Sequence, residues 1–516
     1  MHRNPPTPYQ QPEYNQEQSQ RFITACRNVR TPAEMNRVFT QYDPNAILND
    51  GFTMLGRLAY QNSFRQIEII LKHSSKVDPN LPSKNGRTPL IEAILNDSVD
   101  TVRILLASPK VNTDLYDNDG CFALYYAVSK GYLNIVNLIL LKKPNLQLKT
   151  INMPTTALQY AVIKGHIEIV KALVKAKAQV DYRCEVDEPS AFELLARFES
   201  QHFSKNHLEI AKFLIKHVKD LNTEAISIIG DLKLTSLQTL IMGSTLSDTQ
   251  YEFFHLLLSS GASISPFVCN GINHFLLDPC FKHKTEVHRK IAKLLIRTLK
   301  QKNDLNTLQK ISEISGFTPL AMAARIGWQD VCEDLLDAGV NVNGYSDNSY
   351  TPLMAAAYFG HLNIVKLLVD KYKADINLQN SHGETAAMCA IASNHFEILY
   401  YLINNTNIDF SLKTKNDCDM FHLAACSGYI KIAELIGKKI SPHSLTKNGT
   451  NALFFAIQEG HPEMTRYLLN QGIKYSHRSE DDASPIVVAL NEIDALKLRL
   501  TEESSLETRP SIEKKI

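Results

Sequence analysis

The stretch TPLMAAAYFGHLNIVKLL, from Thr351 to Leu368, decides the fold. Its opening Thr-Pro suits a helix start, because the threonine hydroxyl accepts a hydrogen bond from an unpaired backbone N–H and the missing N–H of proline costs nothing in the first turn. Gly360 suits a helix end, where the backbone adopts a conformation that a Cβ resists. The apolar residues after it recur at helical spacing up to Leu368. The stretch therefore predicts two short helices joined by a tight turn.

The same frame recurs along most of the chain. It reads TPLAMAARIGWQDVCEDLL from Thr318 and TPLIEAILNDSVDTVRILL from Thr88, and it returns at Thr385 after Thr351. Further copies begin near Thr53, Phe122, Thr156, Ser190, Thr235, Asn273, Asp419, Asn451 and Ser484. The pattern predicts about 12 or 13 helix–turn–helix repeats.

A T-P-L opening that returns with a period of about 33 residues, as from Thr318 to Thr351, resembles the ankyrin repeat. The resemblance extends over nearly all of the sequence and implies an all-α solenoid in which each helix pair stacks on the next. It also implies that the protein binds one or more other proteins along a concave groove, which is lined by the turn tips and by the exposed positions of each first helix. Such an adaptor is expected to be neither an enzyme nor dependent on a cofactor.

Length and composition agree with a repeat array. A chain of 516 residues exceeds the ~250–300 residues of one compact core, and its net charge of +1 gives no overall attraction to nucleic acid, so a nucleic-acid partner is not expected. The longest apolar run, from Ile135 to Leu141, is too short to span a membrane. Nine scattered cysteines without a secretory signal favour reduced thiols and a cytoplasmic location.

Repeat spacing divides the chain into segments. We expect a disordered stretch at 1–20, a helical cap at 21–51, regular repeats at 52–183, divergent repeats with insertions at 184–317, regular repeats at 318–490, and a helix end with a polar tail at 491–516. The insertions are predicted at Glu199–Asn206, Gly243–Thr249 and Asp278–His288. Insertions in solenoids are either loops that have drifted or specialised contact regions, and the sequence leaves both interpretations open.

Transferred onto these residues, the family's groove includes an unusual number of aromatic side chains. Large rings dominate the energy of many protein interfaces, but such rings can also pack on neighbouring repeats. The positions that the resemblance assigns to the groove are Tyr116, Asn118, Asp119, Lys130, Lys164, Phe317, Arg325, Ile326, Tyr345, Asp347, Asn348, Tyr350, Tyr358, Phe359, Ser381 and His382.

Other chemistry has weaker support. The sequence contains no phosphate-binding glycine loop, dinucleotide fingerprint or H-E-x-x-H motif, and His166, His361 and His461 recur at one repeat position, where they are expected to tie turns together. Cysteine and histidine are zinc ligands, so a catalytic or metal-binding insertion within 184–317 is the alternative to a pure scaffold. Its weak candidate ligands are Cys269, His274, Cys280 and His283.

Two further hypotheses concern context. The stretch Lys282–Lys302 is locally basic, which suits either an ordinary solvated helix face or a surface for an acidic partner or a membrane. The repeat-only architecture and the Glu-bearing tail TEESSLETRPSIEKKI also resemble ankyrin-repeat effectors that intracellular bacteria deliver by type IV secretion. Under that hypothesis the protein would act on host proteins in the host cytosol.

Overall fold

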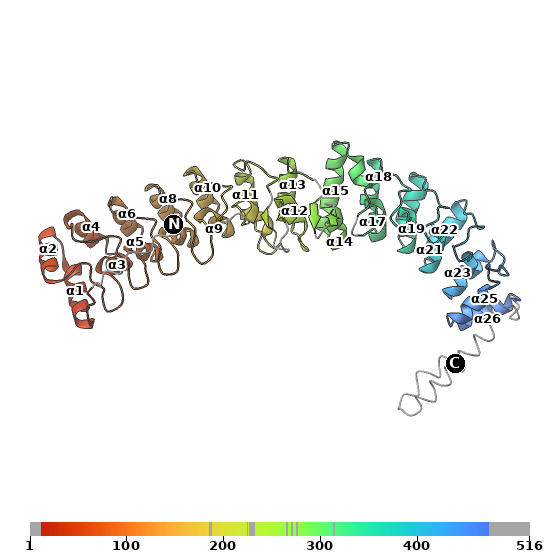
Figure 1. Ribbon diagram of the computed structural model, residues 1–516, viewed down its shortest axis with the longest axis horizontal. Helices are drawn as coiled ribbons and strands as arrows, with labels where there is room; N and C mark the ends of the chain where they lie inside the picture. Colours follow the sequence, from red (N-terminus) through yellow and green to blue (C-terminus); the bar gives the residue numbers. More distant parts are fainter. Residues whose placement is uncertain are drawn as a thin grey trace, which may run out of the picture. The chain divides into compact units, whose positions relative to one another are not determined.

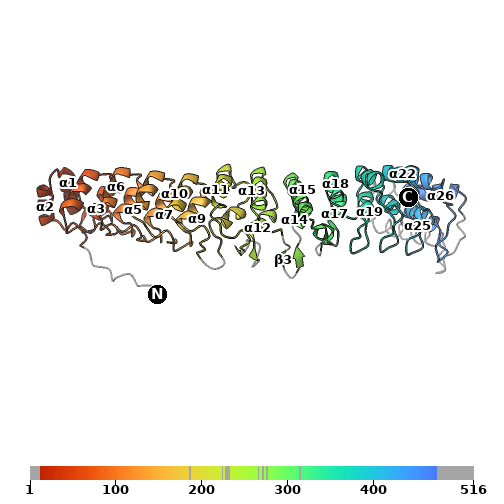
Figure 2. The same ribbon diagram turned by 90° about the horizontal axis from the view of Figure 1, so that it is seen from above.

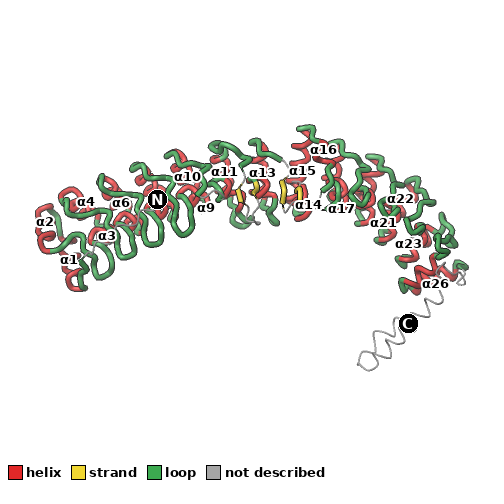
Figure 3. Tube along the Cα trace, viewed as in Figure 1, coloured by secondary structure: helices red, strands yellow, loops and turns green. Residues whose placement is uncertain are grey.

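The computed structural model describes residues 12–184, 188–223, 225–226, 233–264, 267–269, 272–274, 277–312 and 315–473. The chain forms two compact units, Met1–Ile264 and Ser265–Ile516. Within each unit, short helices follow one another in pairs, and long loops join one pair to the next (Figure 1; Figure 3). The all-α repeat architecture predicted from the sequence is therefore confirmed.

The first unit opens with a cap of two helices, α1 (Gln16–Asn28) and α2 (Pro32–Gln41). In α1 the Asn15 side chain accepts from the backbone N–H of Gln18, and that N-cap starts the helix inside the segment 1–20 that we predicted to be disordered. The prediction is therefore wrong for residues 16–20, while residues 1–11 lie outside the described part of the chain. The cap has an aromatic core in which Phe22 stacks on Tyr42 with ring centroids 4.9 Å apart.

Four regular pairs and two divergent pairs complete this unit. The regular pairs are α3 (Met54–Tyr60) with α4 (Phe64–His73), α5 (Pro89–Leu95) with α6 (Val99–Ala107), α7 (Ala123–Ser129) with α8 (Leu133–Leu140), and α9 (Ala157–Ile163) with α10 (Ile167–Lys175). The divergent pairs are η1 (Glu193–Arg197) with α11 (Lys205–Leu214) and α12 (Ser236–Ile241) with α13 (Asp248–Ser259).

The second unit contains six pairs in its described residues. These are α14 (Leu277–His283) with α15 (Glu286–Gln301), α17 (Pro319–Ile326) with α18 (Gln329–Asp337), α19 (Pro352–Tyr358) with α20 (Leu362–Lys366), α21 (Ala386–Ala392) with α22 (Phe396–Asn405), α23 (Met420–Cys426) with α24 (Ile430–Ile436), and α25 (Ala452–Gln458) with α26 (Pro462–Asn470). A short helix α16 (Leu305–Gln309) follows α15, and a π-helical segment η2 (Leu367–Lys371) continues α20. Apart from the cap, the described residues thus form twelve pairs, and the copy predicted at Ser484 lies outside them.

Two hairpins extend turns of the divergent region. Strand β1 (Ala225–Ile226) pairs antiparallel with β2 (Lys233–Leu234), and β3 (Phe267–Cys269) pairs antiparallel with β4 (Ile272–His274). Asn273 pairs with Val268 in this second hairpin, so the prediction that a repeat helix starts at Asn273 is wrong. The dipeptide Asn270–Gly271, a strong hairpin signal, was the clue in the sequence.

The ends of the first helices follow the predicted chemistry. The Thr351 side chain accepts from the backbone N–H of Met354, Pro352 occupies the first helical turn, and Thr318 and Thr385 cap their helices in the same way. Leu353, Ala356 and the other apolar residues of α19 are buried, because the small alanines let neighbouring first helices approach closely. The turn tips extend from the side of the first helices (Figure 2).

Candidate functional site

Backbone hydrogen bonds hold consecutive turn tips of the second unit together. The Asp347 N–H donates to the Gly316 carbonyl oxygen at 2.9 Å, and the Ser381 N–H donates to the Asn348 carbonyl oxygen at 3.1 Å. The next tip continues the ladder, since the Lys415 N–H donates to the His382 carbonyl oxygen at 2.9 Å. Four of the residues predicted for the groove, Asp347, Asn348, Ser381 and His382, thus lie on one laterally bonded row of tips.

Four predicted residues form a continuous cluster beside this row. The guanidinium carbon of Arg325 lies 5.4 Å from the ring centroid of Phe317 and 5.1 Å from that of Phe359, so the cation lies against two rings. The rings of Tyr358 and Phe359 are 5.1 Å apart, and about two fifths of each side chain is exposed. We call Phe317, Arg325, Tyr358 and Phe359 the aromatic cluster. It presents large rings to solvent at the end of α19.

The remaining aromatic residues of this region divide into two kinds. Tyr345 is exposed, whereas Tyr350 is half-buried and packs edge-on against Phe317 with ring centroids 6.4 Å apart. The Tyr350 hydroxyl lies 3.5 Å from the Glu384 carboxylate, and burial raises the pKa of Tyr350. Tyr350 therefore packs between repeats, and its place in the groove remains a prediction. Ile326, the last residue of α17, is also only partly exposed.

In the first unit the predicted groove residues are mostly exposed and partly tied to neighbouring tips. The Tyr116 hydroxyl donates to the Lys149 carbonyl oxygen at 2.9 Å, and the Asn118 amide donates to the Lys84 carbonyl oxygen at 2.9 Å. Asp119 pairs with Arg87 at 3.6 Å. The remaining two positions, Lys130 and Lys164, follow the ends of α7 and α9 and are exposed.

Sequence reasoning missed a second aromatic group in the first unit. Tyr125 of α7 and Tyr160 of α9 have ring centroids 4.5 Å apart, and the Lys164 ammonium lies 5.4 Å from the Tyr160 centroid. Burial, followed by the hydrogen bond with Tyr160, raises the pKa of Tyr125. The signal was available, because the two tyrosines occupy neighbouring positions of consecutive repeat frames that begin at Phe122 and Thr156.

Histidines tie several repeats to the ones before them. His361 Nε2 lies 3.1 Å from the Arg325 carbonyl oxygen, and His461 Nε2 lies 2.9 Å from the Cys426 carbonyl oxygen. The predicted structural role is therefore confirmed for these two residues. His166 packs on the preceding repeat as well, since a Cβ added to Gly131 would lie 3.1 Å from its Cε1.

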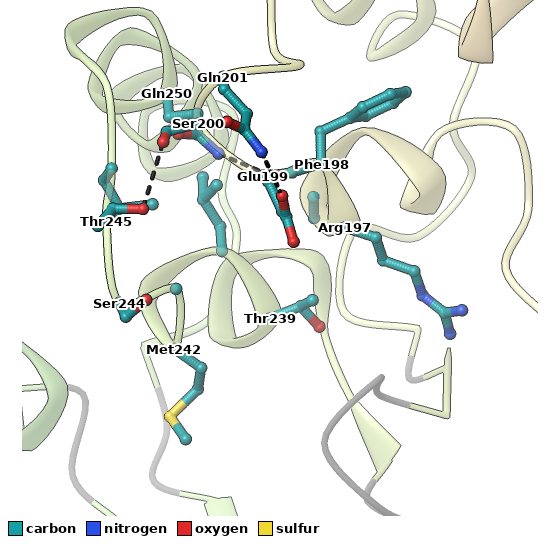
Figure 4. Close-up of a pocket in the computed structure, with 14 residues that line it drawn as sticks. Arg197, Phe198, Glu199, Ser200, Gln201, Thr239, Met242, Ser244, Thr245 and Gln250 are labelled. Carbon is teal, nitrogen blue, oxygen red and sulfur yellow. Dashed lines mark hydrogen bonds between the residues drawn. The ribbon is translucent and has the colours of Figure 1, made fainter.

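Two predicted insertions meet around a cavity. Segments 196–201 and 239–246, together with Gln250, line a cavity of about 590 Å³ (Figure 4). The Ser200 and Thr245 hydroxyl oxygens are 3.2 Å apart and bridge the two loops. The third predicted insertion, Asp278–His288, is not an inserted loop. Most of this segment belongs to α14, the first helix of a pair, and its last residues begin α15. The repeat predicted to start at Asn273 therefore starts later in the sequence.

The candidate zinc ligands lie in different elements. Cys280 is fully buried within α14, and burial raises the pKa of its thiol, while burial also lowers the pKa of His283. Cys269 and His274 belong to β3 and β4, and their side chains are outside the described part of the structure. Among the described residues, no group of three or more His, Cys, Asp or Glu side chains could hold a metal ion. The four-ligand site remains a prediction.

The basic stretch Lys282–Lys302 contributes several cations to the neighbouring repeat. Arg289 and Lys293 each place a nitrogen 2.6 Å from the Asp330 carboxylate of α18, and the Lys300 ammonium donates to the Asp337 carbonyl oxygen at 2.7 Å. Burial raises the pKa of Asp330, but the hydrogen bonds from Lys293 and Arg289 outweigh it and lower the pKa overall. Three cationic side chains of α15 thus bind the neighbouring helix α18. Fewer cationic side chains are left to contact a membrane or an acidic partner.

These features define the class of protein: a solenoid of helix pairs in which long turns join each pair to the next. The family description "Ankyrin repeats (3 copies)" matches residues 22–115, 55–150, 109–184, 284–380, 372–444 and 421–502. These matches cover well over half of the sequence, and the chain belongs to the ankyrin-repeat family. None of the helices in the described residues is both long and apolar enough to cross a membrane.

Curated relatives share this architecture over different lengths. The chain is 33% identical over 185 residues to the Saccharomyces cerevisiae protein named "Probable 26S proteasome regulatory subunit p28", covering 34% of this chain and 80% of that protein. It is 36% identical over 104 residues to an ankyrin repeat-containing protein of Schizosaccharomyces pombe, covering 20% of this chain and 48% of the relative. The human transient receptor potential cation channel subfamily A member 1 is 25% identical over 428 residues, which are 82% of this chain and 33% of the channel.

Among solved structures, a chain of the Bdellovibrio bacteriovorus complex between predatory endopeptidase Bd0816 and immunity protein Bd3460 is similar to part of this protein. The sequence identity is 26% with a TM-score of 0.32, over 35% of this chain and 95% of that chain.

Proposed function

We propose that this protein is an interaction scaffold that binds a partner protein at the aromatic cluster and the adjoining row of turn tips. Membership of the ankyrin-repeat family supports a protein-binding role in general. The observation that carries the specific site is the contact of the Arg325 guanidinium with the rings of Phe317 and Phe359. This arrangement fixes exposed rings in place before binding, so little conformational entropy is lost when a partner covers them.

The chemistry of the cluster indicates what the partner presents. Tyr and Arg are the residue types that most often dominate binding energy, and here they lie beside polar tip residues that form a rim. Asp347, Asn348 and His382 are exposed on the neighbouring tips and offer hydrogen-bonding groups around the rings. An apolar or aromatic anchor with polar neighbours on the partner would match this surface.

An affinity pull-down tests the site. Replacing Tyr350, Tyr358 and Phe359 with alanine is expected to remove the main partner from the captured set without unfolding the repeats. The matched control is Tyr400→Ala, because Tyr400 is about as exposed but lies on the second helix α22. Equal capture by wild type, the triple variant and the control would refute the aromatic cluster as the binding site.

The alternative of an enzyme centres on residues 184–317. The described parts of this segment contain three helix pairs, two short hairpins and the helix α16, and the cavity lies between α12 and the 198–201 loop. The cavity lining carries hydroxyl and amide groups, one carboxylate and one guanidinium, without histidine, cysteine or lysine. This set lacks the usual paired nucleophile and base, so it favours recognition over catalysis.

The effector hypothesis remains a proposal about context. It is supported by the repeat-rich sequence and by the Glu-bearing tail at 501–516, which lies outside the described residues. Deleting residues 501–516 from a reporter fusion is expected to stop delivery into host cells if the tail is a translocation signal. Unchanged delivery would refute that role for the tail.

A further inference from the structure

In several regular repeats, a histidine lies at the edge where the first helix turns into the second. His361 Nε2 bonds to the Arg325 carbonyl oxygen, and its ring lies so close to Gly327 that an added Cβ there would be 2.7 Å from Cε1. His395 makes the same contact with Gly360 one repeat later, with a corresponding distance of 2.5 Å. This edge lies at the opposite end of the first helix from the turn tips.

The divergent repeats keep this hydrogen bond to the preceding repeat, but the loop between their first and second helices is longer. His207 Nε2 lies 3.4 Å from the Ile163 carbonyl oxygen, and in the next repeat the Gln250 amide donates to the Phe198 carbonyl oxygen at 2.9 Å. In both cases the tying residue has moved into the first turn of the second helix, where it completes a capping box with Ser204 or Ser247. The hydrogen bond between repeats is retained, but the loops between the first and second helices are longer. The two longer loops line a cavity of about 590 Å³.

The cavity has an acidic end and an apolar wall. Figure 4 shows the Glu199 side chain extending from its loop toward α12, with its carboxylate 2.9 Å from the Gln201 amide nitrogen. The exposed His202 lies on the same loop, with Nδ1 3.7 Å from that carboxylate. The apolar wall is formed by Ala196, Leu240 and Leu246, whereas the Met242 side chain points away from Glu199 in Figure 4.

The one cationic residue of the lining is directed elsewhere. Burial lowers the pKa of Arg197, and the nearby carboxylates of Glu188 and Glu193 counteract that effect. In Figure 4 the Arg197 guanidinium points away from Glu199. The charge offered to a ligand is therefore that of Glu199, whose side chain is 74% exposed.

We propose that this cavity, the edge pocket, binds an extended segment of a partner protein that carries a lysine or arginine next to an aliphatic residue. The cation would pair with Glu199, and the aliphatic side chain would pack against Leu240 and Leu246. The hydroxyls of Ser244 and Thr245 supply donors and acceptors for the peptide backbone. The volume falls within the ~300–1,000 Å³ of typical ligand pockets.

This inference does not depend on the aromatic cluster. The edge pocket lies wholly in the first unit, whereas the aromatic cluster lies in the second. The two sites share no residue, although both include the C-terminal ends of first helices. Either site can therefore fail its test without affecting the other.

The test is a display library of short random peptides panned against the full chain. Enriched peptides are expected to share a basic residue beside an aliphatic one. The strongest of them, synthesised with a fluorophore, is expected to bind about tenfold more weakly to Glu199→Gln, because a charge-assisted hydrogen bond is lost. Ser244→Trp, which places a large ring on an exposed loop of the lining, is expected to abolish binding.

Controls make the outcome decisive. Glu209→Gln removes an equal charge from the exposed face of α11 and is expected to leave affinity unchanged, as is Phe359→Ala in the aromatic cluster. Matching circular dichroism melts establish that Glu199→Gln and Ser244→Trp are folded. Enriched peptides without a basic residue, unchanged affinity in both pocket variants, or no enrichment at all would each overturn the proposal. Loss of binding in Phe359→Ala alone would assign the peptides to the groove and overturn it too.

Discussion

His395 Nε2 lies 3.0 Å from the carbonyl oxygen of Tyr358, and the same imidazole covers Gly360. The contact joins the repeat of α21 and α22 to the end of α19, where the exposed rings of the aromatic cluster are carried. Stability in a repeat array is approximately a sum of individual units and nearest-neighbour interfaces. This hydrogen bond therefore links the stability of one interface to the geometry of the proposed binding site.

We predict that Gly360→Ala lowers the free energy of unfolding by about 2–3 kcal/mol, since the left-handed backbone and the steric conflict with His395 both oppose a Cβ. Gly360 has φ of +82°, and its added Cβ would lie 2.5 Å from His395 Cε1. Urea unfolding and hydrogen exchange in α19 and α22 measure the effect.

Gly339→Ala is the matched control for that experiment. Gly339 has φ of +92°, but an added Cβ would meet no atom of the described residues within 4 Å. The control is expected to cost only about 1 kcal/mol from backbone strain. Equal losses in the two variants would show that the histidine contact contributes nothing.

The second prediction concerns Asp419, which caps α23 and accepts from His422 Nδ1 at 2.7 Å. Burial raises the pKa of Asp419, but hydrogen bonding and the charge of His422 outweigh it and lower the pKa from 3.8 to about 2. Because the folded pKa lies below the unfolded one, the stabilisation is complete well above pH 4 and is lost as pH falls through the folded pKa.

Asp419→Asn keeps a capping oxygen but removes the charge. We expect it to lower the free energy of unfolding by about 2 kcal/mol at neutral pH, with the difference from wild type shrinking by roughly half near pH 3. Urea titrations at a series of pH values measure this difference. A difference that stays constant with pH would mean that ionisation of Asp419 does not stabilise the fold.

The third prediction separates the two roles of Arg325. In Arg325→Lys the charge remains, but the planar guanidinium that contacts Phe317 and Phe359 is lost. We expect partner affinity to fall about three- to tenfold, with a change in stability below about 1 kcal/mol. Titration of the captured partner and thermal melts report the two quantities. An affinity equal to that of wild type would show that the guanidinium does not preorganise the rings.

The fourth prediction tests whether the basic helix α15 is held by its neighbour. Asp330→Asn is expected to destabilise the protein by about 1 kcal/mol at low salt, and less at high salt, because this carboxylate accepts from both Arg289 and Lys293 but remains partly exposed. Glu397→Gln removes a comparable exposed charge from α22 and serves as the control. The idea fails if salt affects the two variants alike.

Much of the architecture could be predicted because residues within each repeat determine where its helices begin and end. The side chains of Thr318, Thr351 and Thr385 cap their own helices. Gly327 ends α17, and Gly360 lies in the turn that follows α19. These features depend on few contacts with distant residues. The frame failed at Asn273, where no Thr-Pro opening is present and the hairpin β3–β4 replaces a helix start. The predicted helical cap at 21–51 also begins too late, because Asn15, the N-cap of α1, falls in the segment 1–20 that is predicted to be disordered.

The candidate sites were less predictable, because they depend on which repeats become neighbours. Sequence alone determined the all-α solenoid, since a local pattern that returns once in every repeat encodes it. Only the tertiary structure decided that Arg325 would contact the ring of Phe359 in the next repeat, that Tyr350 would be half-buried, and that two insertions would enclose one cavity. Those outcomes arise from packing between units, where distances are set by side chains that belong to different repeats of the chain.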